Sequence, residues 1–233
     1  MVSFSGTGEY LNKNNYDEET LNAYNFSTTG DGTVDVYGNI GSLINNSNIQ
    51  GKNYIFNYLF YNCDNITDVS KLILPYIELT QFCYDHMFEG CNNLTTPPTL
   101  PATTLARGCY YQMFHSCTSL TSAPALPATT LAQGCYHRMF QWCSSLSTAP
   151  FLPATTLVRQ CYYYMFKGCT NLSSIEVGFT VWTDTETTSA TLNWVYNVAP
   201  TGIFTKPDEL SAEYGDSRIP TNWTIDGEEA ELP

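Results

Sequence analysis

The stretch LPATTLARGCYYQMFHSC, residues 100–117, occurs three times in this chain with changes at only a few positions. It returns as LPATTLAQGCYHRMFQWC at residues 126–143 and as LPATTLVRQCYYYMFKGC at residues 152–169. Its second half has a further copy, CYDHMFEGC at residues 83–91, at the same spacing of 26 residues. A fixed period of this length predicts a solenoid, because each unit buries its apolar face only by stacking on the next.

The repeat also predicts how the chain is organised. A degenerate unit, IFNYLFYNC, begins at Ile55, so we expect an array of about four to five units over residues 53–176. The flanks, residues 1–52 with GTVDVYG and residues 177–233 with FTVWTDTETT, are expected to be β-rich end pieces that cover the first and last units. The predicted fold class is therefore α/β, a solenoid of short parallel strands and short helices between two end pieces.

Residues 109–117 divide into two faces when they are placed on a helix at about 100° per residue. The continuous apolar face consists of Cys109, Tyr110, Met113, Phe114 and Cys117. The opposite face consists of Tyr111, Gln112, His115 and Ser116. We therefore expect a short helix whose first face lies in the core and whose second face lies in solvent.

The remainder of each unit is predicted to be extended. A Leu flanked by Ser or Thr follows the second Cys, and prolines come soon after it, which is typical of a short strand. These inward-facing leucines are Leu94, Leu120, Leu146 and Leu172. The LPATTL segment is expected to return the chain to the helix, held in the core by Leu79, Leu105, Leu131 and Leu157.

Nine cysteines are present, and all of them belong to the two Cys columns of the repeat, with Cys63 in the degenerate first unit. Two cysteines eight residues apart on a helix would be about 12 Å apart along its axis, too far for a disulfide within one unit. Free Cys packs as a small hydrophobe. The pattern favours two ladders of reduced thiols, and disulfides between neighbouring units are the alternative.

Charge is distributed unevenly along the chain. Nine Lys and Arg against 22 Asp and Glu give a formal net charge of −13, which argues against nucleic acid as a partner. Residues 90–175, however, contain no acidic residue and four basic ones. Either the stacked units avoid repeating a charge, or this part of the array has a selected binding surface.

The units differ from one another mainly at positions on the predicted solvent face. Together with Arg107, these varying positions are the candidate binding residues: Arg107, Tyr111, Gln112, His115, His137, Arg138, Gln141, Trp142, Tyr163, Tyr164 and Lys167. Aromatic and amide side chains make contact area at low entropic cost in recognition surfaces. The alternative is that unburied positions vary by drift, since only buried ones are constrained.

Catalytic and metal-binding motifs are not evident. The sequence has no nucleophile elbow, HExxH, P-loop, CxxC or carboxylate pair, and its three histidines all lie on the predicted solvent face. We expect neither an enzyme nor a cofactor. The residues MVSFSGTGEYLNKNNYDEET do not resemble a secretory signal, and no run of about 18 apolar residues occurs, so we also expect no membrane insertion by this chain.

The repeat resembles the leucine-rich repeats of BspA-like surface proteins of gut and oral bacteria. The matching positions are Leu100, Pro101, Leu105, Cys109, Met113, Phe114, Cys117 and Leu120. A variety with LPATTL…CY..MF..CTSL, found in gut bacteria and their phages, is similar over nearly the whole chain. It has a leader like VDVYGNIGSL (residues 34–43) and an ending like TGIFTKPDELSAEYGDSRIPTNWTI (residues 201–225).

The resemblance implies a leucine-rich-repeat solenoid with a noncatalytic role. The implied function is recognition or adhesion at the cell surface or outside the cell, with a host-surface protein or glycan as partner. The alternative is a structural, fibre or decoration component of a phage virion, whose partners would be other envelope or virion proteins.

Overall fold

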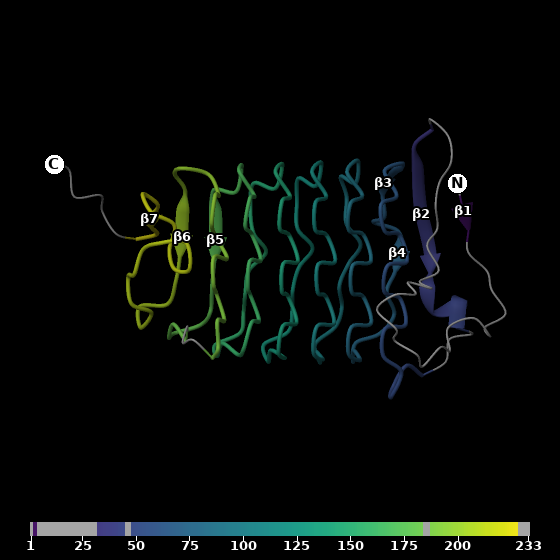
Figure 1. The fold of residues 1–233 in the computed structure, drawn as a ribbon, viewed down its shortest axis with the longest axis horizontal. Coiled ribbons are helices and arrows are strands. Elements are labelled where there is room, and N and C mark those ends of the chain that lie inside the picture. Colours follow the sequence, from purple (N-terminus) through teal and green to yellow (C-terminus); the bar gives the residue numbers. More distant parts are fainter. Residues whose placement is uncertain (1, 4–31, 45–47, 184–186, 228–233) are drawn as a thin grey trace.

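The computed structural model describes residues 2–3, 32–44, 48–183 and 187–227. In these residues the chain forms an elongated stack in which successive repeat units lie side by side in chain order (Figure 1). Parallel strands mark both ends of the stack. Most of the predicted N-terminal end piece, residues 4–31, lies outside the described residues, as do residues 228–233 of the C-terminal one.

Two small parallel sheets contain the regular strands of the described chain. The first consists of β1 (Val2–Ser3), β2 (Val34–Asn39), β3 (Ile66–Asp68) and β4 (Leu72–Ile73), with β1, β3 and β4 all paired to β2. The 3-10 helix η1 (Ile40–Ile44) follows β2 directly. The second sheet consists of β5 (Ser174–Glu176), β6 (Ile203–Thr205) and β7 (Thr224–Ile225), in that order.

Between these sheets the predicted strands shrink to single bridges. The leucines at the strand positions are fully buried, as expected: Leu94, Leu120, Leu146 and Leu172. Some neighbouring units pair there through isolated parallel bridges, such as Asp68 with Thr96 and Thr148 with Ser174, and Glu78 pairs with Thr104 in the return segment. Prolines soon follow Thr96 and Thr148 and have no N–H to donate, which limits the length of the ladder.

The predicted helix of each unit is not formed, and this prediction is wrong. Residues 134–143 are instead a run of consecutive turns in which backbone donors alternate. Every second N–H, from Gly134 to Trp142, donates to a carbonyl of the next unit at 2.8–3.1 Å. The N–H groups between them, from Cys135 to Cys143, donate to the carbonyl three residues earlier at 3.1–3.2 Å.

Runs of turns of this kind recur along the chain, and we number them turn segments 1 to 6. They are residues 54–63, 82–91, 108–117, 134–143, 160–169 and 189–197. A nine-residue α-helix would leave its first four N–H groups and last four C=O groups without partners in the helix. Stacked turns pair these groups with the neighbouring units, which explains why the repeat favours them.

A left-handed backbone at every fourth residue makes the turns possible. In turn segment 4 these residues are Gly134, Arg138 (φ 56°) and Trp142 (φ 66°). Glycine, free of a Cβ, tolerates this conformation best, and other residues adopt it at a cost. An α-helix contains no such residues, so this backbone excludes a helix for the segment.

The core is nevertheless the one that the sequence predicts. The turn pattern repeats every four residues, whereas an α-helix repeats every 3.6. Over only nine residues the two periods point nearly the same side chains inward. Their Cys, Tyr, Met, Phe and Cys side chains are all at most 1% exposed in turn segments 2 to 5. Rings stack along the array, with Phe centroids 5.3–5.8 Å apart from Phe60 to Phe166.

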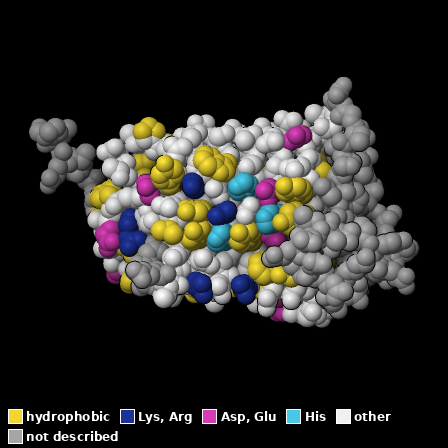
Figure 2. All heavy atoms as spheres, in the orientation of Figure 1, with side chains coloured by type: hydrophobic (Ala, Val, Ile, Leu, Met, Phe, Trp, Pro, Cys, Tyr) yellow, Lys and Arg dark blue, Asp and Glu magenta, His cyan; other side chains and the backbone are white. Residues whose placement is uncertain are grey.

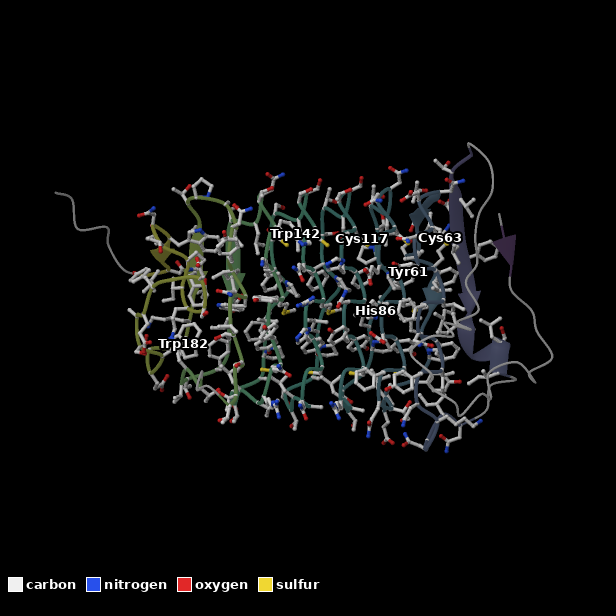
Figure 3. All side chains as sticks on the ribbon, in the orientation of Figure 1. Tyr61, Cys63, His86, Cys117, Trp142 and Trp182 are labelled. Carbon is white, nitrogen blue, oxygen red and sulfur yellow. The ribbon has the colours of Figure 1, made fainter. Side chains whose placement is uncertain are left out.

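All nine cysteines are free and buried, as the thiol-ladder prediction requires. In the second Cys column each thiol from Cys91 onward donates to the carbonyl of the Phe in the preceding unit, for example Cys117 Sγ to Phe88 O at 3.1 Å and Cys143 Sγ to Phe114 O at 3.0 Å. Figure 3 shows Cys63 and Cys117 at different places along the array but at the same height across it. Each thiol from Cys91 onward thus also links two units.

The ladder of turns continues beyond the last obvious copy of the repeat. Turn segment 6 has left-handed residues at Ser189, Asn193 and Asn197, and its carbonyls accept the N–H groups of turn segment 5. Trp194 fills the core there, with its ring 6.1 Å from that of Phe166. The division of the chain into residues 1–52, 53–176 and 177–233 stays a prediction.

Candidate functional site

The turn segments present one row of outward side chains per unit, and together these rows form what we call the turn face. In turn segments 2 to 5 it consists of Asp85, His86, Glu89, Gly90, Tyr111, Gln112, His115, Ser116, His137, Arg138, Gln141, Trp142, Tyr163, Tyr164, Lys167 and Gly168. Figure 2 shows hydrophobic, His and Lys or Arg side chains gathered over the middle of the array. The turn face therefore brings together all the predicted candidates except Arg107.

A row of stacked rings runs along the turn face. The ring centroids of Tyr111 and His137 are 4.5 Å apart, and those of His137 and Tyr163 are also 4.5 Å apart. Towards the N-terminus the row continues through His86, which lies 5.4 Å from Tyr111 and 4.4 Å from Tyr58. Because neighbours cover both faces of the inner rings, those rings present only their edges to solvent.

The N-terminal part of the turn face is acidic and internally paired. Glu89 lies between two histidines of adjacent units, 3.3 Å from His86 Nε2 and 3.4 Å from His115 Nδ1. His86 Nδ1 also contacts the buried carboxylate of Asp85, and Gln112 Nε2 donates to Glu89 Oε2 at 3.4 Å. Burial raises the pKa of Asp85, and the hydrogen bond from His86 opposes this rise.

The C-terminal part of the turn face is basic, and its cations lie on aromatic rings. Arg138 Cζ is 5.2 Å from the centroid of Tyr164, and Lys167 Nζ is 4.6 Å from the same centroid. Lys167 Nζ is also 5.2 Å from the ring of Tyr196 in turn segment 6. A hydrogen bond from Asn193, followed by interactions with Tyr163 and the two cations, lowers the pKa of Tyr164.

Trp142 is a large exposed ring of the turn face, at 41% exposure. It lies over Gly168 of the next unit, where an added Cβ would come within 2.1 Å of Trp142 Cε3. Phe82 lies over Gly108 in the same way, and Arg107 sits above Phe82 with Cζ 5.8 Å from the ring centroid. Arg107 is therefore exposed at the border of the turn face, beside the acidic part.

Three candidates that were predicted to face solvent are in fact buried. Gln112, His137 and Gln141 are 8%, 8% and 6% exposed. The rings of Tyr111 and Tyr163 cover His137, and Gln112 contacts Glu89 of the preceding unit. The remaining candidates are half-buried or exposed: Arg107, Tyr111, His115, Arg138, Trp142, Tyr163, Tyr164 and Lys167. The helical projection considers one unit at a time, so it cannot predict burial by side chains of a neighbouring unit.

Turn segment 4 has the unusual polar chemistry of the face. His137 Nδ1, Arg138 Nε and Gln141 Oε1 are buried without a hydrogen-bond partner among the described residues. Burial, together with the charge of Arg138, lowers the pKa of His137 to about 3. The imidazole is therefore neutral at physiological pH, with one donor and one acceptor nitrogen.

Some residues of the turn face were not among the predicted candidates. Tyr58 belongs to the degenerate first unit, and Tyr196 belongs to turn segment 6, which has neither Cys nor Met. The signal for segment 6 is the spacing of Ser189, Asn193 and Asn197, four residues apart, since Asn tolerates the left-handed conformation better than most residues. Asp85, His86 and Glu89 are visible in the repeat alignment as varying positions.

Two further properties of the described residues concern what the face binds. They contain no group of three His, Cys, Asp or Glu side chains placed to hold a metal ion. No helix found in them has the length and hydrophobicity needed to cross a membrane. The arrangement offers noncovalent contacts from ring edges, one exposed indole, two cations and several amide and hydroxyl groups.

Comparison with known proteins supports the repeat assignment. A family model described as the BspA type leucine rich repeat region matches in six copies, over residues 30–121 and 53–184. A search of curated proteins and a search of solved structures each returned no significant match. The family match covers more than half of the chain and includes turn segments 1 to 5.

Proposed function

Because this chain belongs to the BspA-type leucine-rich repeat family, we propose that it is a noncatalytic recognition protein whose turn face binds a protein or glycan on a host surface. Leucine-rich repeats are scaffolds for protein interaction, and solenoids offer extended surfaces that suit this role. We place the protein at the cell surface or outside the cell, where surface-associated members of this family act.

The contrast between core and face is the observation that carries the proposal. The five core columns are the same in turn segments 2 to 5, whereas the turn face changes from unit to unit. It changes in an ordered way: carboxylates occupy the N-terminal part, and cations on aromatic rings occupy the C-terminal part. Drift in exposed positions predicts no such order of charges along the array.

The test is attachment of the purified protein to host cells and to mucin-coated surfaces. Alanine at Arg138, Trp142 and Tyr163 together is expected to abolish attachment while the far-ultraviolet circular dichroism is kept. A matched control carries alanine at Thr103, Thr129 and Thr155, which are exposed in the LPATTL segments outside the turn face. Unchanged attachment of the first variant would refute a role of the turn face.

The second candidate is a structural component of a phage virion, which the resemblance to the phage variety of the repeat favours. In that role the end pieces would make contacts between copies, and the array would act as a spacer. Light scattering of the isolated chain is then expected to show a symmetric oligomer. A monomer at micromolar concentration would count against this candidate and leave the recognition role in place.

A further inference from the structure

From the side chains that turn segments 4 and 5 place together, we infer that the C-terminal part of the turn face binds a glycan that carries a carboxylate, such as a uronic or sialic acid. This inference rests on the proposed recognition role of the turn face. Four side chains carry it: Arg138 and Trp142 from segment 4, and Tyr164 and Lys167 from segment 5.

The first step concerns the two cations. Neither Arg138 nor Lys167 forms an ion pair with a carboxylate of the described residues, and both lie against the ring of Tyr164. The sequence has no acidic residue from position 90 to 175, so turn segments 3 to 5 supply no counter-ion. An arginine guanidinium is shaped to bind a carboxylate through two parallel hydrogen bonds, and a lysine beside it adds a second charge.

The second step concerns the aromatic surface. Trp142 has no ring partner among the described residues, and one side of its indole lies on Gly168. In contrast, the inner rings of the stacked row, such as His137, have both faces covered. Trp142 thus offers a flat apolar surface in the turn segment that also carries Arg138, and a sugar ring with its axial C–H groups fits such a surface. Figure 3 shows its position on the array.

The third step concerns the polar atoms between these groups. Gln141 lies between Arg138 and Trp142 in the turn, and its Oε1 has no partner among the described residues, nor does Arg138 Nε. Buried polar atoms are ordinarily hydrogen-bonded. Rotation of these side chains would present an acceptor and a donor to the hydroxyl groups of a sugar, which both donate and accept.

The backbone of this region argues against a peptide as the ligand. Every N–H from Gly134 to Cys143 already donates to a carbonyl of the turn or of the next unit. A peptide therefore cannot add as a further strand here, although main-chain pairing is what gives such peptides their affinity. Recognition must rely on side chains, and the set present here consists of a flat ring, two cations and amide groups.

The experiment measures binding of the full chain to matched immobilised probes by biolayer interferometry. The probes are a galacturonate hexamer and its methyl ester, 3′-sialyllactose and lactose, and poly-L-glutamate as an acidic peptide. Each acidic sugar is expected to bind at least about tenfold more tightly than its neutral counterpart. A tenfold difference corresponds to about 1.4 kcal/mol, roughly what one hydrogen bond to a charged group contributes. Arg138→Gln with Lys167→Gln should remove this preference, and Trp142→Ala should weaken binding of all four sugars.

The outcomes separate this inference from the proposed function. Equal binding of acidic and neutral sugars overturns the carboxylate requirement, and binding of poly-L-glutamate without any sugar overturns the glycan. If no probe binds although the alanine variant at Arg138, Trp142 and Tyr163 loses attachment to host surfaces, the inference fails and the recognition role stands. If that variant keeps its attachment, both fail.

Discussion

Substitution of Ser116 tests the backbone of the turn segments directly, because the sign of the effect distinguishes turns from a helix. Ser116 has φ 61° and occupies the column in which turn segments 2 and 5 have Gly90 and Gly168. Ser116→Ala and Ser116→Gly both remove the hydroxyl that lies 3.1 Å from His115 Nδ1. The difference between the two variants therefore reports the backbone alone.

The expected magnitude follows from two opposing contributions. A non-glycine residue in the left-handed region costs about 1–2 kcal/mol, and glycine avoids this cost. Glycine also makes the unfolded chain more flexible, which destabilises the folded state by about 0.4–1 kcal/mol. Ser116→Gly is therefore expected to be more stable than Ser116→Ala by about 0.5–1 kcal/mol. In a helix, alanine would be the more stable by about 1 kcal/mol.

Urea unfolding followed by circular dichroism measures this difference, with the free energy of unfolding obtained by linear extrapolation. In thermal melts the expected shift is about 2–3 °C in favour of glycine for a chain of this length. If the alanine variant is the more stable by about 1 kcal/mol, the left-handed conformation at this column is wrong. The same result would restore the helix that the apolar periodicity predicts.

Three further predictions concern the core, the thiols and the stacked rings. Met139→Asp is expected to lose at least about 3 kcal/mol of stability or to unfold the middle units, since it puts an unpaired charge in a fully buried column; a soluble variant with an unchanged spectrum would contradict the register of the array. Burial raises the pKa of the Cys143 and Cys169 thiols, so Ellman's reagent should label none of the nine cysteines rapidly in the native state and all nine after unfolding without reductant; fewer after unfolding would reveal disulfides. Because the folded-state pKa of His137 is about 3, below its unfolded value of 6.5, its contribution to stability is present above pH 6.5 and is lost as the pH falls towards 3. Relative to His137→Phe, which keeps a ring in the stack, the wild type should lose about 2 kcal/mol between pH 7 and pH 4.5, and parallel pH profiles of the two proteins would exclude a buried neutral imidazole.

The sequence is sufficient to predict the repeat, the buried columns and the free thiols. The sequence period predicts burial correctly because stacking constrains the same five positions in every unit. Over nine positions, a periodicity of 3.6 and a periodicity of four also select nearly the same residues. Met113 and Phe114, for example, are fully buried under either geometry. What distinguishes the geometries is the backbone at Gln112 and Ser116, where a left-handed conformation is not indicated by the residue type.

The candidate site could be predicted only in part. The varying positions did identify most of the turn face, but contacts between units depend on side chains 26 residues apart that no single unit reveals. For this reason the burial of His137 between Tyr111 and Tyr163 could not be predicted from one helical projection. The same holds for the shared position of Glu89 between His86 and His115.

Replacing helices by stacked turns changes what the variable residues can do. On separate helices each tyrosine could present a ring face to a ligand. In stacked turns the neighbouring units lie about 5 Å apart, and the rings pack against one another and hold the units together. Aromatic content alone is then a poor measure of binding surface on this array. The residues beside the row matter more, because Arg138 and Trp142 belong to other columns: the Arg138 guanidinium lies on the ring of Tyr164, and Trp142 lies over Gly168 with no stacked ring among the described residues. A ligand that gains from a cation and an open indole must therefore bind over turn segments 4 and 5 and not along the whole face.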